Sequence, residues 1–145
     1  MTRRTKRHDR ERGSEAIEAA IGIPAFVLFI ALIIAAGRIA IADQAVEAAA
    51  ADAARSASIS RTQGEANATA ESRAAATLAN QQLQCLSMGV SVDTSGFASP
   101  AGTPTDVTAT VTCVVNLSDV AIPGLPGSHT ITATMTSPID TYRER

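Results

Sequence analysis

The sequence predicts an α+β protein: a single N-terminal transmembrane helix extended into an alanine-rich helix, then a second helix, then a small three-stranded antiparallel sheet. Three observations predict this class. An uncharged apolar run near the N-terminus is long enough to span a bilayer. An alanine-dense stretch with high helix propensity follows it. Beyond Ser87 the apolar residues recur at every second position, which is the period of a half-buried strand.

Composition limits the size and the chemistry of the protein. Its 145 residues allow one small domain with an appendage and exclude a two-domain enzyme. Although 46% of the residues are hydrophobic, only 3% are aromatic, so alanine and β-branched side chains must fill the core. The two cysteines and two histidines lack the spacing of a four-ligand zinc site, and we expect neither a metal nor a cofactor.

The N-terminal region joins a basic leader to an apolar run. Residues 1–13 carry half of the 12 lysines and arginines. The 19 uncharged residues from Ala19 to Gly37 span about 28 Å as a helix, close to the ~30 Å hydrocarbon thickness of a bilayer. Because basic residues flank the cytoplasmic end of membrane helices, we expect a cytoplasmic N-terminus, a transmembrane helix over 14–42 and an extracytoplasmic C-terminal domain.

A secretory signal peptide is an alternative interpretation of the same run. Ala40-Ile41-Ala42 offers a small-residue site, and cleavage after Ala42 would release a small secreted domain. The apolar run is longer than the ~7–15 residues usual in signal peptides, and Arg38 precedes the cleavage site. A retained anchor therefore fits the sequence better.

Glu18 is the informative residue, because it begins the apolar run instead of standing outside it. A carboxylate at the centre of a membrane helix costs roughly 2.5–3.5 kcal/mol, and less near the interface. At headgroup depth the helix dipole would favour it mildly. Gly13 precedes Glu18 with four residues between them, and the pair lies between the basic leader and the apolar helix.

This arrangement resembles a type IV prepilin-like cleavage site, at which a membrane-embedded aspartyl peptidase cuts after the glycine on the cytoplasmic side. The resemblance implies cleavage between Gly13 and Ser14 and retention of the apolar helix. The new ammonium of Ser14, in the same or a neighbouring subunit, could then neutralise the Glu18 carboxylate when helices pack side by side. Such pairing would be the physical reason to tolerate Glu18.

The stretch from Arg10 to Arg55 is similar to the N-terminal region of TadE-like pseudopilins of the tight-adherence (Flp) pilus system. The matching features are Gly13 and Glu18, Pro24 in the first half of the helix, the Gly37-Arg38 pair, and the Ala-Ala-Asp-Ala-Ala-Arg run that ends at Arg55. The resemblance implies a non-enzymatic, single-pass protein of the bacterial cytoplasmic membrane. The implied partners are a prepilin peptidase, other pilins and pseudopilins, the membrane platform proteins of pilus assembly and the lipid bilayer, with no direct nucleic-acid binding.

Residues 43–86 are predicted to form an extracytoplasmic helical region. The membrane helix continues through the alanine-dense stretch to about Ala57, and Ser58 to Gly64 interrupts the pattern. A second helix is expected from Glu65 to about Gln84.

Residues 87–145 are predicted to form the sheet. Alternation of apolar and polar residues predicts three strands, around Met88 to Val92, Val107 to Leu117 and Ile131 to Met135. Cys113 lies on the apolar face of the middle strand, and Cys85 is expected at the end of the second helix. Two extracytoplasmic cysteines in a domain with few large core residues indicate a disulfide, the alternative being two buried free thiols.

Catalytic motifs are absent from the sequence: no nucleophile motif, phosphate-binding glycine loop or HExxH pattern occurs. Three functions therefore compete. The preferred one is a processed pseudopilin of a tight-adherence pilus or related secretion filament. The others are a single-pass surface protein with an uncut anchor and a ligand-binding outer domain, and the secreted domain cleaved after Ala42.

Overall fold

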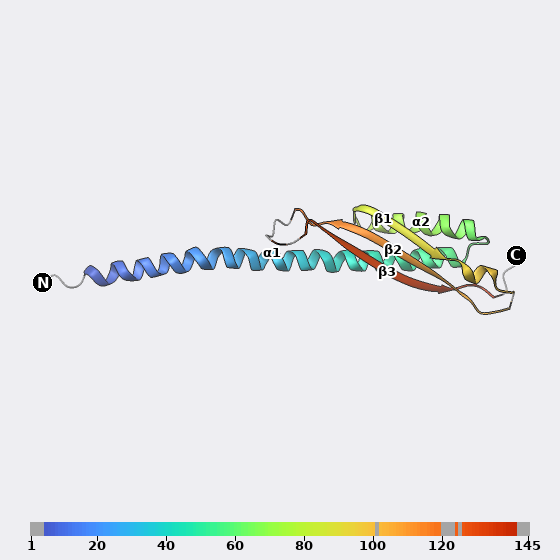
Figure 1. The fold of residues 1–145 in the computed structure, drawn as a ribbon, viewed down its shortest axis with the longest axis horizontal. Coiled ribbons are helices and arrows are strands. Elements are labelled where there is room, and N and C mark those ends of the chain that lie inside the picture. Colours follow the sequence, from blue (N-terminus) through green and yellow to red (C-terminus); the bar gives the residue numbers. More distant parts are fainter. Residues whose placement is uncertain (1–4, 101, 120–123, 125, 142–145) are drawn as a thin grey trace.

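The computed structural model describes residues 5–100, 102–119, 124 and 126–141, with side chains described from Ile17 onward. The elements follow in the order α1 (Thr5–Ser58), α2 (Gln63–Asn80), β1 (Cys85–Asp93), a short 3₁₀ helix η1 (Ser95–Ala98), β2 (Asp106–Asn116) and β3 (Ser128–Pro138). α1 projects far beyond the other elements, which gather along its C-terminal part (Figure 1). This confirms the predicted α+β class.

α1 is one continuous helix of 54 residues with Pro24 in its interior, as the extended helix of the prediction requires. Its C-terminal third turns a face of small side chains toward the rest of the protein. The buried residues of that face are Ala42, Ala45, Val46, Ala49, Ala50, Ala53, Ala54 and Ala57. Alanine favours the helix and also lets neighbouring elements approach its backbone closely.

At the start of α2, side chains accept hydrogen bonds from backbone amides that have no partner within the helix. Thr62 is the N-cap residue, and its Oγ1 accepts a hydrogen bond from the amide of Glu65 at 3.2 Å. The Glu65 carboxylate accepts in return from the amide of Arg61 at 3.0 Å. This reciprocal arrangement is close to a capping box, and it explains why the chain turns sharply between the two helices.

α2 ends at Asn80, earlier than the expected end near Gln84. Gln82 adopts the left-handed conformation with φ 58°, and the amide of Leu83 bonds back to the carbonyl of Leu78 at 3.0 Å. Glycine or asparagine usually occupies such a helix-terminating position, so glutamine gave no signal in the sequence. As a result Cys85 opens β1 instead of closing the helix.

The sheet is antiparallel with the strand order β1-β2-β3. Its inner face carries the predicted apolar residues: Val107, Ala109, Val111 and Cys113 of β2 are fully buried, and Ile131 and Ala133 of β3 are nearly so. Its outer face carries three threonine pairs between β2 and β3, namely Thr108–Thr136, Thr110–Thr134 and Thr112–Thr132, with Oγ1 to Oγ1 distances of 3.2, 3.0 and 3.3 Å. The predicted alternation is confirmed in β2 and β3; in β1 it holds for Val90 and Val92, which are half-buried, while Met88 is exposed.

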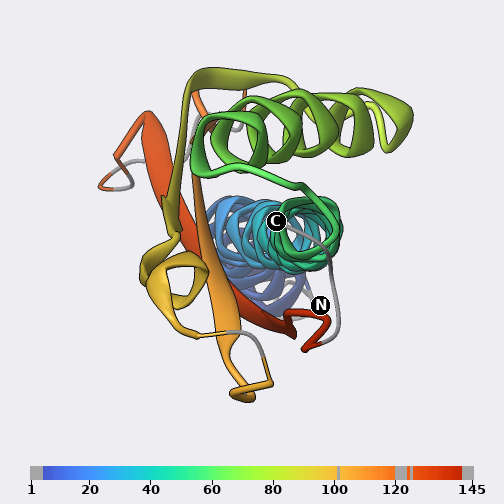
Figure 2. The same cartoon turned by 90° about the vertical axis from the view of Figure 1, so that its right-hand side faces the viewer.

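The outer domain, residues 42–141, has two layers, with both helices on the same face of the sheet (Figure 2). α1 contacts β2 and β3, while α2 contacts α1 and β1. α2 contributes Ala66, Ala70, Ala74 and Leu78 to the interface. The largest fully buried side chains are Val46, Val107, Val111 and Cys113, so the core is built from small residues at close spacing.

One end of the outer domain, here called the distal end, lies farthest from the projecting part of α1 (Figure 1). The last residue of α1, Ser58, meets β3 there, since the Ser137 hydroxyl donates to Ser58 Oγ at 3.0 Å. Asp106 at the start of β2 is in register with Pro138, the last residue of β3. The ends of α1, β1 and β3 and the start of β2 therefore share this end.

Candidate functional site

The N-terminal part of α1 presents large apolar side chains with no protein layer over them. Twelve exposed residues share this property, with exposed fractions from 41% to 70%: Ile17, Ile21, Ile23, Phe26, Val27, Leu28, Phe29, Ile30, Leu32, Ile33, Ile34 and Ile41. Only 6% of the most apolar 18-residue window of the helix is buried inside the protein. A helix of a soluble core would be mostly covered, so this segment needs an apolar environment from outside the chain.

Within the described residues, the helical stretch Ile17–Ser58 is long and apolar enough to cross a membrane. The apolar run predicted from the sequence, Ala19 to Gly37, is almost entirely uncovered, with Ala35 its one buried residue, and a regularly buried face of α1 begins only at Ala42. The structure is therefore consistent with a single-pass membrane anchor whose helix continues without a break into the outer domain.

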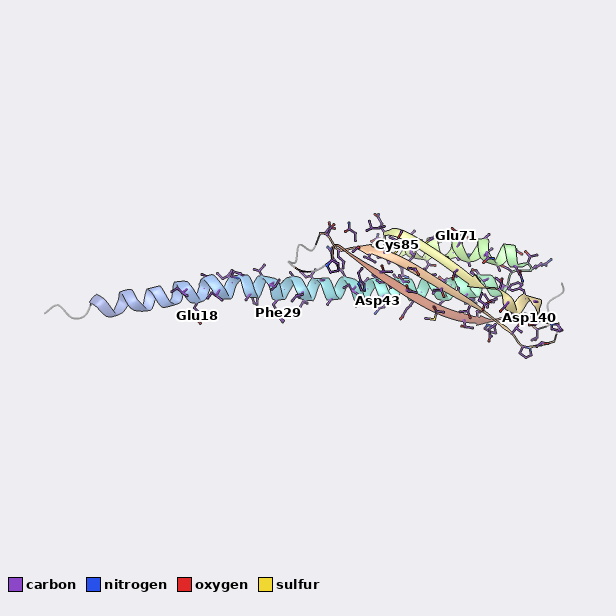
Figure 3. All side chains as sticks on the ribbon, in the orientation of Figure 1. Glu18, Phe29, Asp43, Glu71, Cys85 and Asp140 are labelled. Carbon is purple, nitrogen blue, oxygen red and sulfur yellow. A yellow bond between two sulfur atoms is a disulfide. The ribbon has the colours of Figure 1, made fainter. Side chains whose placement is uncertain are left out.

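Glu18 lies at the N-terminal edge of the uncovered region, between Ile17 and the apolar side chains that follow (Figure 3). Its side chain is exposed, and within the described part of the chain no side chain or backbone group pairs with it. A carboxylate on an otherwise apolar helical segment needs either water, a headgroup or a positive charge from another molecule. None of the described side chains supplies a positive charge at this position.

Gly13 and Ser14, the predicted processing residues, lie inside α1. Their backbone is helical, and the helix extends back to Thr5 without interruption, so the leader and the apolar segment form one helix here. The side chain of Ser14 lies outside the described side chains. Gly13 and Glu18 are five residues apart, which places them a little more than one helical turn from each other along α1.

Cys85 and Cys113 form a disulfide with a Cα to Cα distance of 5.4 Å. The prediction of a Cys85–Cys113 bridge is confirmed, and the alternative of two free thiols is not observed. Cys113 is fully buried on the inner face of β2, and Cys85 opens β1 just before a bulge at Leu86. The bond thus ties β1 to the middle strand where the pairing register shifts, next to the turn from α2.

A groove between α1 and α2 was not predicted from the sequence. Four exposed polar or charged side chains, Asp52, Arg55, Arg73 and Asn80, line it together with Ile59. In the sequence, Asp52 and Arg55 stand out only as parts of the Ala-Ala-Asp-Ala-Ala-Arg run of the alanine-rich helix. Arg73 reaches the same groove because of the orientation of α2 about its own axis. Burial of one face of α2 fixes that orientation, and the buried residues are Ala66, Ala70, Ala74 and Leu78.

The described part of the structure contains no candidate metal site, because no group of three or more His, Cys, Asp or Glu residues there could hold an ion. The features that stand out among the described residues are instead an uncovered apolar helical segment, a carboxylate at its start for which no described group is a partner, and a small disulfide-linked domain at the other end of α1.

Comparison with known protein families identifies a match to part of the chain. Residues 13–55 match the family model described as TadE-like protein. The matched segment begins at the glycine of the predicted processing site and ends in the last turn of α1. It therefore includes both the exposed apolar part of α1 and the alanine-rich continuation. No curated protein and no solved structure matches the chain.

Proposed function

From the TadE-like match over residues 13–55, we propose that this chain is a membrane-anchored minor pilin or pseudopilin. A prepilin peptidase processes it after Gly13, and it takes part in the assembly of a tight-adherence pilus or a related secretion filament. The match itself supports involvement in tight-adherence pilus assembly, a role for which no catalytic site is required. The uncovered part of α1 is the observation that carries the proposal, because assembly needs a helix free to meet lipid and other subunits.

In the proposed topology, residues 1–13 form the cytoplasmic leader and 14–42 the membrane helix. Residues 43–86 and 87–145 then form the extracytoplasmic helical and sheet regions. The basic leader supports this orientation through the preference of positive charge for the cytoplasmic side. A disulfide in the outer domain supports it too, since such bonds persist in oxidising extracytoplasmic compartments.

Processing after Gly13 requires the helix to open locally. Proteases bind their substrates as extended chains, and Gly13 lies in a helical backbone. A glycine inside a helix weakens it by roughly 0.5–1 kcal/mol relative to alanine, and it lets the enzyme approach the backbone without a Cβ. Gly13 thus lowers the free-energy cost of unwinding at the bond to be cut.

After the cut, Glu18 would lie five residues into the mature chain, one turn from the new ammonium of Ser14. Its exposure and its lack of a partner within the described chain leave it available to the ammonium of its own or a neighbouring subunit. In an apolar surrounding an unpaired carboxylate is costly, so the pair would fix how far one helix slides along the next.

Mass analysis of the N-terminus in protein purified from its native membrane tests this proposal. The processed pseudopilin begins at Ser14, a surface protein with an uncut anchor begins at or near Met1, and a secreted domain begins at Asp43. We expect Ser14. A start at Met1 or Asp43 would exclude the processed form.

Gly13→Leu provides the matched genetic test, because a leucine side chain obstructs the approach of the peptidase. We expect the variant to keep the full leader while it remains in the membrane. Gly22→Leu is the control: it also replaces a glycine of α1, at a position where a Cβ meets no atom within 4 Å, and it should be processed normally. Normal processing of Gly13→Leu would remove the proposed site.

A further inference from the structure

The groove between α1 and α2 has the geometry of a docking site for a negatively charged segment. Its volume is about 340 Å³. It is lined by Asp52, Arg55, Ser56 and Ile59 of α1 and the α1–α2 turn, and by Arg73, Ala76, Thr77 and Asn80 of α2. Neighbouring residues of α1, Ala53, Ala54 and Ala57, are buried against the core, so the groove opens on the helical side of the domain.

The two guanidinium groups of the groove, Arg55 and Arg73, outnumber its one carboxylate, Asp52. The Thr77 hydroxyl donates to Asp52 Oδ2 at 2.7 Å, which holds that carboxylate against α2. Within the described part of the chain, neither Arg55 nor Arg73 makes a hydrogen bond or an ion pair through its side chain. Two like charges in one groove repel each other, and an anion placed between them would relieve that repulsion.

This concentration of positive charge stands out against the rest of the outer domain. Residues 43–141 contain three arginines, no lysine and nine carboxylates, a side-chain charge of 3 − 9 = −6. Two of the three arginines therefore share a single groove. Ile59 at its rim is 79% exposed and offers an apolar contact beside the charges. Outside the groove, the charged side chains of residues 43–141 are eight carboxylates and Arg61, so the protein carries groups of both signs for an electrostatic contact.

The negatively charged side chains that could bind such a groove lie in the sheet layer at the distal end. Asp93 at the end of β1, Asp106 at the start of β2 and Asp140 just after β3 are all exposed there. Asp106 is in register with Pro138, two residues before Asp140, and Figure 3 shows Asp140 at the far end of the sheet. We call these three residues the acidic edge.

The groove and the acidic edge both lie toward the distal end of the outer domain. The contact between Ser137 and Ser58 places the end of β3 beside the last residue of α1, within the stretch 52–59 that lines the groove. They belong to different layers, since the groove opens between the helices and the acidic edge ends the sheet. Copies that stand parallel in one membrane would thus present a groove and an acidic edge to each other near the distal end.

We propose that the groove receives the acidic edge of a second copy of this chain anchored in the same membrane. This inference rests on the membrane anchor of the proposed function, because only a shared membrane makes the copies parallel. Arg55 and Arg73 contact carboxylates of the neighbour while Ile59 packs against its surface. The two partners use different patches, so the contact is heterologous and extends from copy to copy into a row. Charge complementarity sets the register of the row.

A zero-length cross-link tests the contact in the full chain. Lys6 is the only lysine in the sequence, so Arg73→Lys keeps the positive charge and adds one primary amine in the outer domain. Variant chains with and without ¹⁵N are mixed in vesicles of phosphatidylethanolamine and phosphatidylglycerol and treated with a carbodiimide, which joins amines to carboxylates in direct contact. We expect mixed-isotope peptides that link position 73 to Asp93, Asp106 or Asp140.

Arg61→Lys is the matched control, because Arg61 is the third arginine of the outer domain and does not line the groove. Links from position 73 between copies should exceed those from position 61 by at least about five-fold, and Asp106→Asn with Asp140→Asn should reduce them by a similar factor. The inference is overturned if position 73 links only to Asp52 of its own chain, links between copies to other carboxylates, or links no better than position 61.

Flotation of the vesicles before cross-linking separates this inference from the proposed function. Chains that do not float with the lipid lack the anchor, and the proposed function then fails together with the inference. Chains that float and give no link from position 73 to the acidic edge contradict the contact between copies alone.

Discussion

Ser137 donates a hydrogen bond from its hydroxyl to Ser58 Oγ at 3.0 Å and so joins the last strand to the end of α1 across 79 residues of sequence. Ser58 is 5% exposed, and its own hydroxyl donates to the carbonyl of Arg55 at 2.9 Å. The pair therefore satisfies polar atoms at the end of a helix that would otherwise be buried without partners.

Removing this contact should weaken the outer domain measurably. We expect Ser137→Ala to lower the free energy of unfolding by about 1 kcal/mol, the usual net value of a partly buried hydrogen bond. Urea unfolding of the full chain, followed by circular dichroism, measures the change. Ser91→Ala, an exposed serine in β1, is the control and should stay within about 0.5 kcal/mol of the parent. Equal stabilities of the two variants would show that the contact contributes nothing.

The glycine at position 96 is required by close packing. A Cβ built there would lie 2.6 Å from the carbonyl oxygen of Asp106, a backbone atom that cannot move without disturbing β2. We expect Gly96→Ala to destabilise the protein by about 1–3 kcal/mol, the range of overpacked sites. In Gly89→Ala the new methyl group meets no atom within 4 Å, so a thermal melt should separate the two alanine variants clearly.

The Cys85–Cys113 bond closes a loop with a sequence separation of 28 residues. In the chain-entropy model, such a loop contributes roughly 3–4 kcal/mol by restricting the unfolded chain. Replacing both cysteines with alanine should lower the unfolding free energy by this amount, a large loss for a core of small side chains. Reduction of the parent with dithiothreitol should reproduce the effect, and the double variant should be insensitive to the reductant.

Hydrogen bonds at the distal end depress the pKa of Asp93 below its ordinary value of 3.8. The backbone amide of Ser95, which donates to Asp93 Oδ1 at 2.9 Å, is the main cause. Since the folded pKa is lower than the unfolded one, the contribution to stability is full above pH 3.8 and is lost as the pH falls through the folded pKa. We expect the stability difference between the parent and Asp93→Asn to shrink over that interval.

NMR titration of the Asp93 carboxyl carbon gives a direct measurement. Its midpoint in the folded protein should lie below 3.8. A midpoint at or above that value would show that the Ser95 amide does not favour the charged form.

Glu18 should matter for assembly rather than for folding. We expect Glu18→Ala to insert and to be processed largely as the parent, because the described chain supplies no partner for this side chain. Copurification of partner subunits should fall several-fold, since the proposed pairing with Ser14 would be lost. Glu47→Ala, an exposed glutamate in the outer part of α1, is the control. Unchanged copurification in Glu18→Ala would contradict the pairing role.

Local patterns in the sequence determined most of the fold. Apolar runs and alternating spacing predicted the long helix, the three strands and the buried face of β2, because burial of one face imposes a period on each element. They also identified Gly13, Ser14 and Glu18 as residues of interest, since a charge inside an apolar run is visible without a structure.

Only the tertiary structure decided the end of α2 and the surfaces between elements. The left-handed Gln82 that stops the helix carries no sequence signature, because several residue types can adopt that conformation when Leu83 is held by the core. Arg55 and Arg73 meet in one groove, and Asp106 and Asp140 in one edge, because packing of small alanine faces fixes the rotation and height of each element. Residues far apart in the chain come to lie in one groove or at one end of the sheet only through that packing.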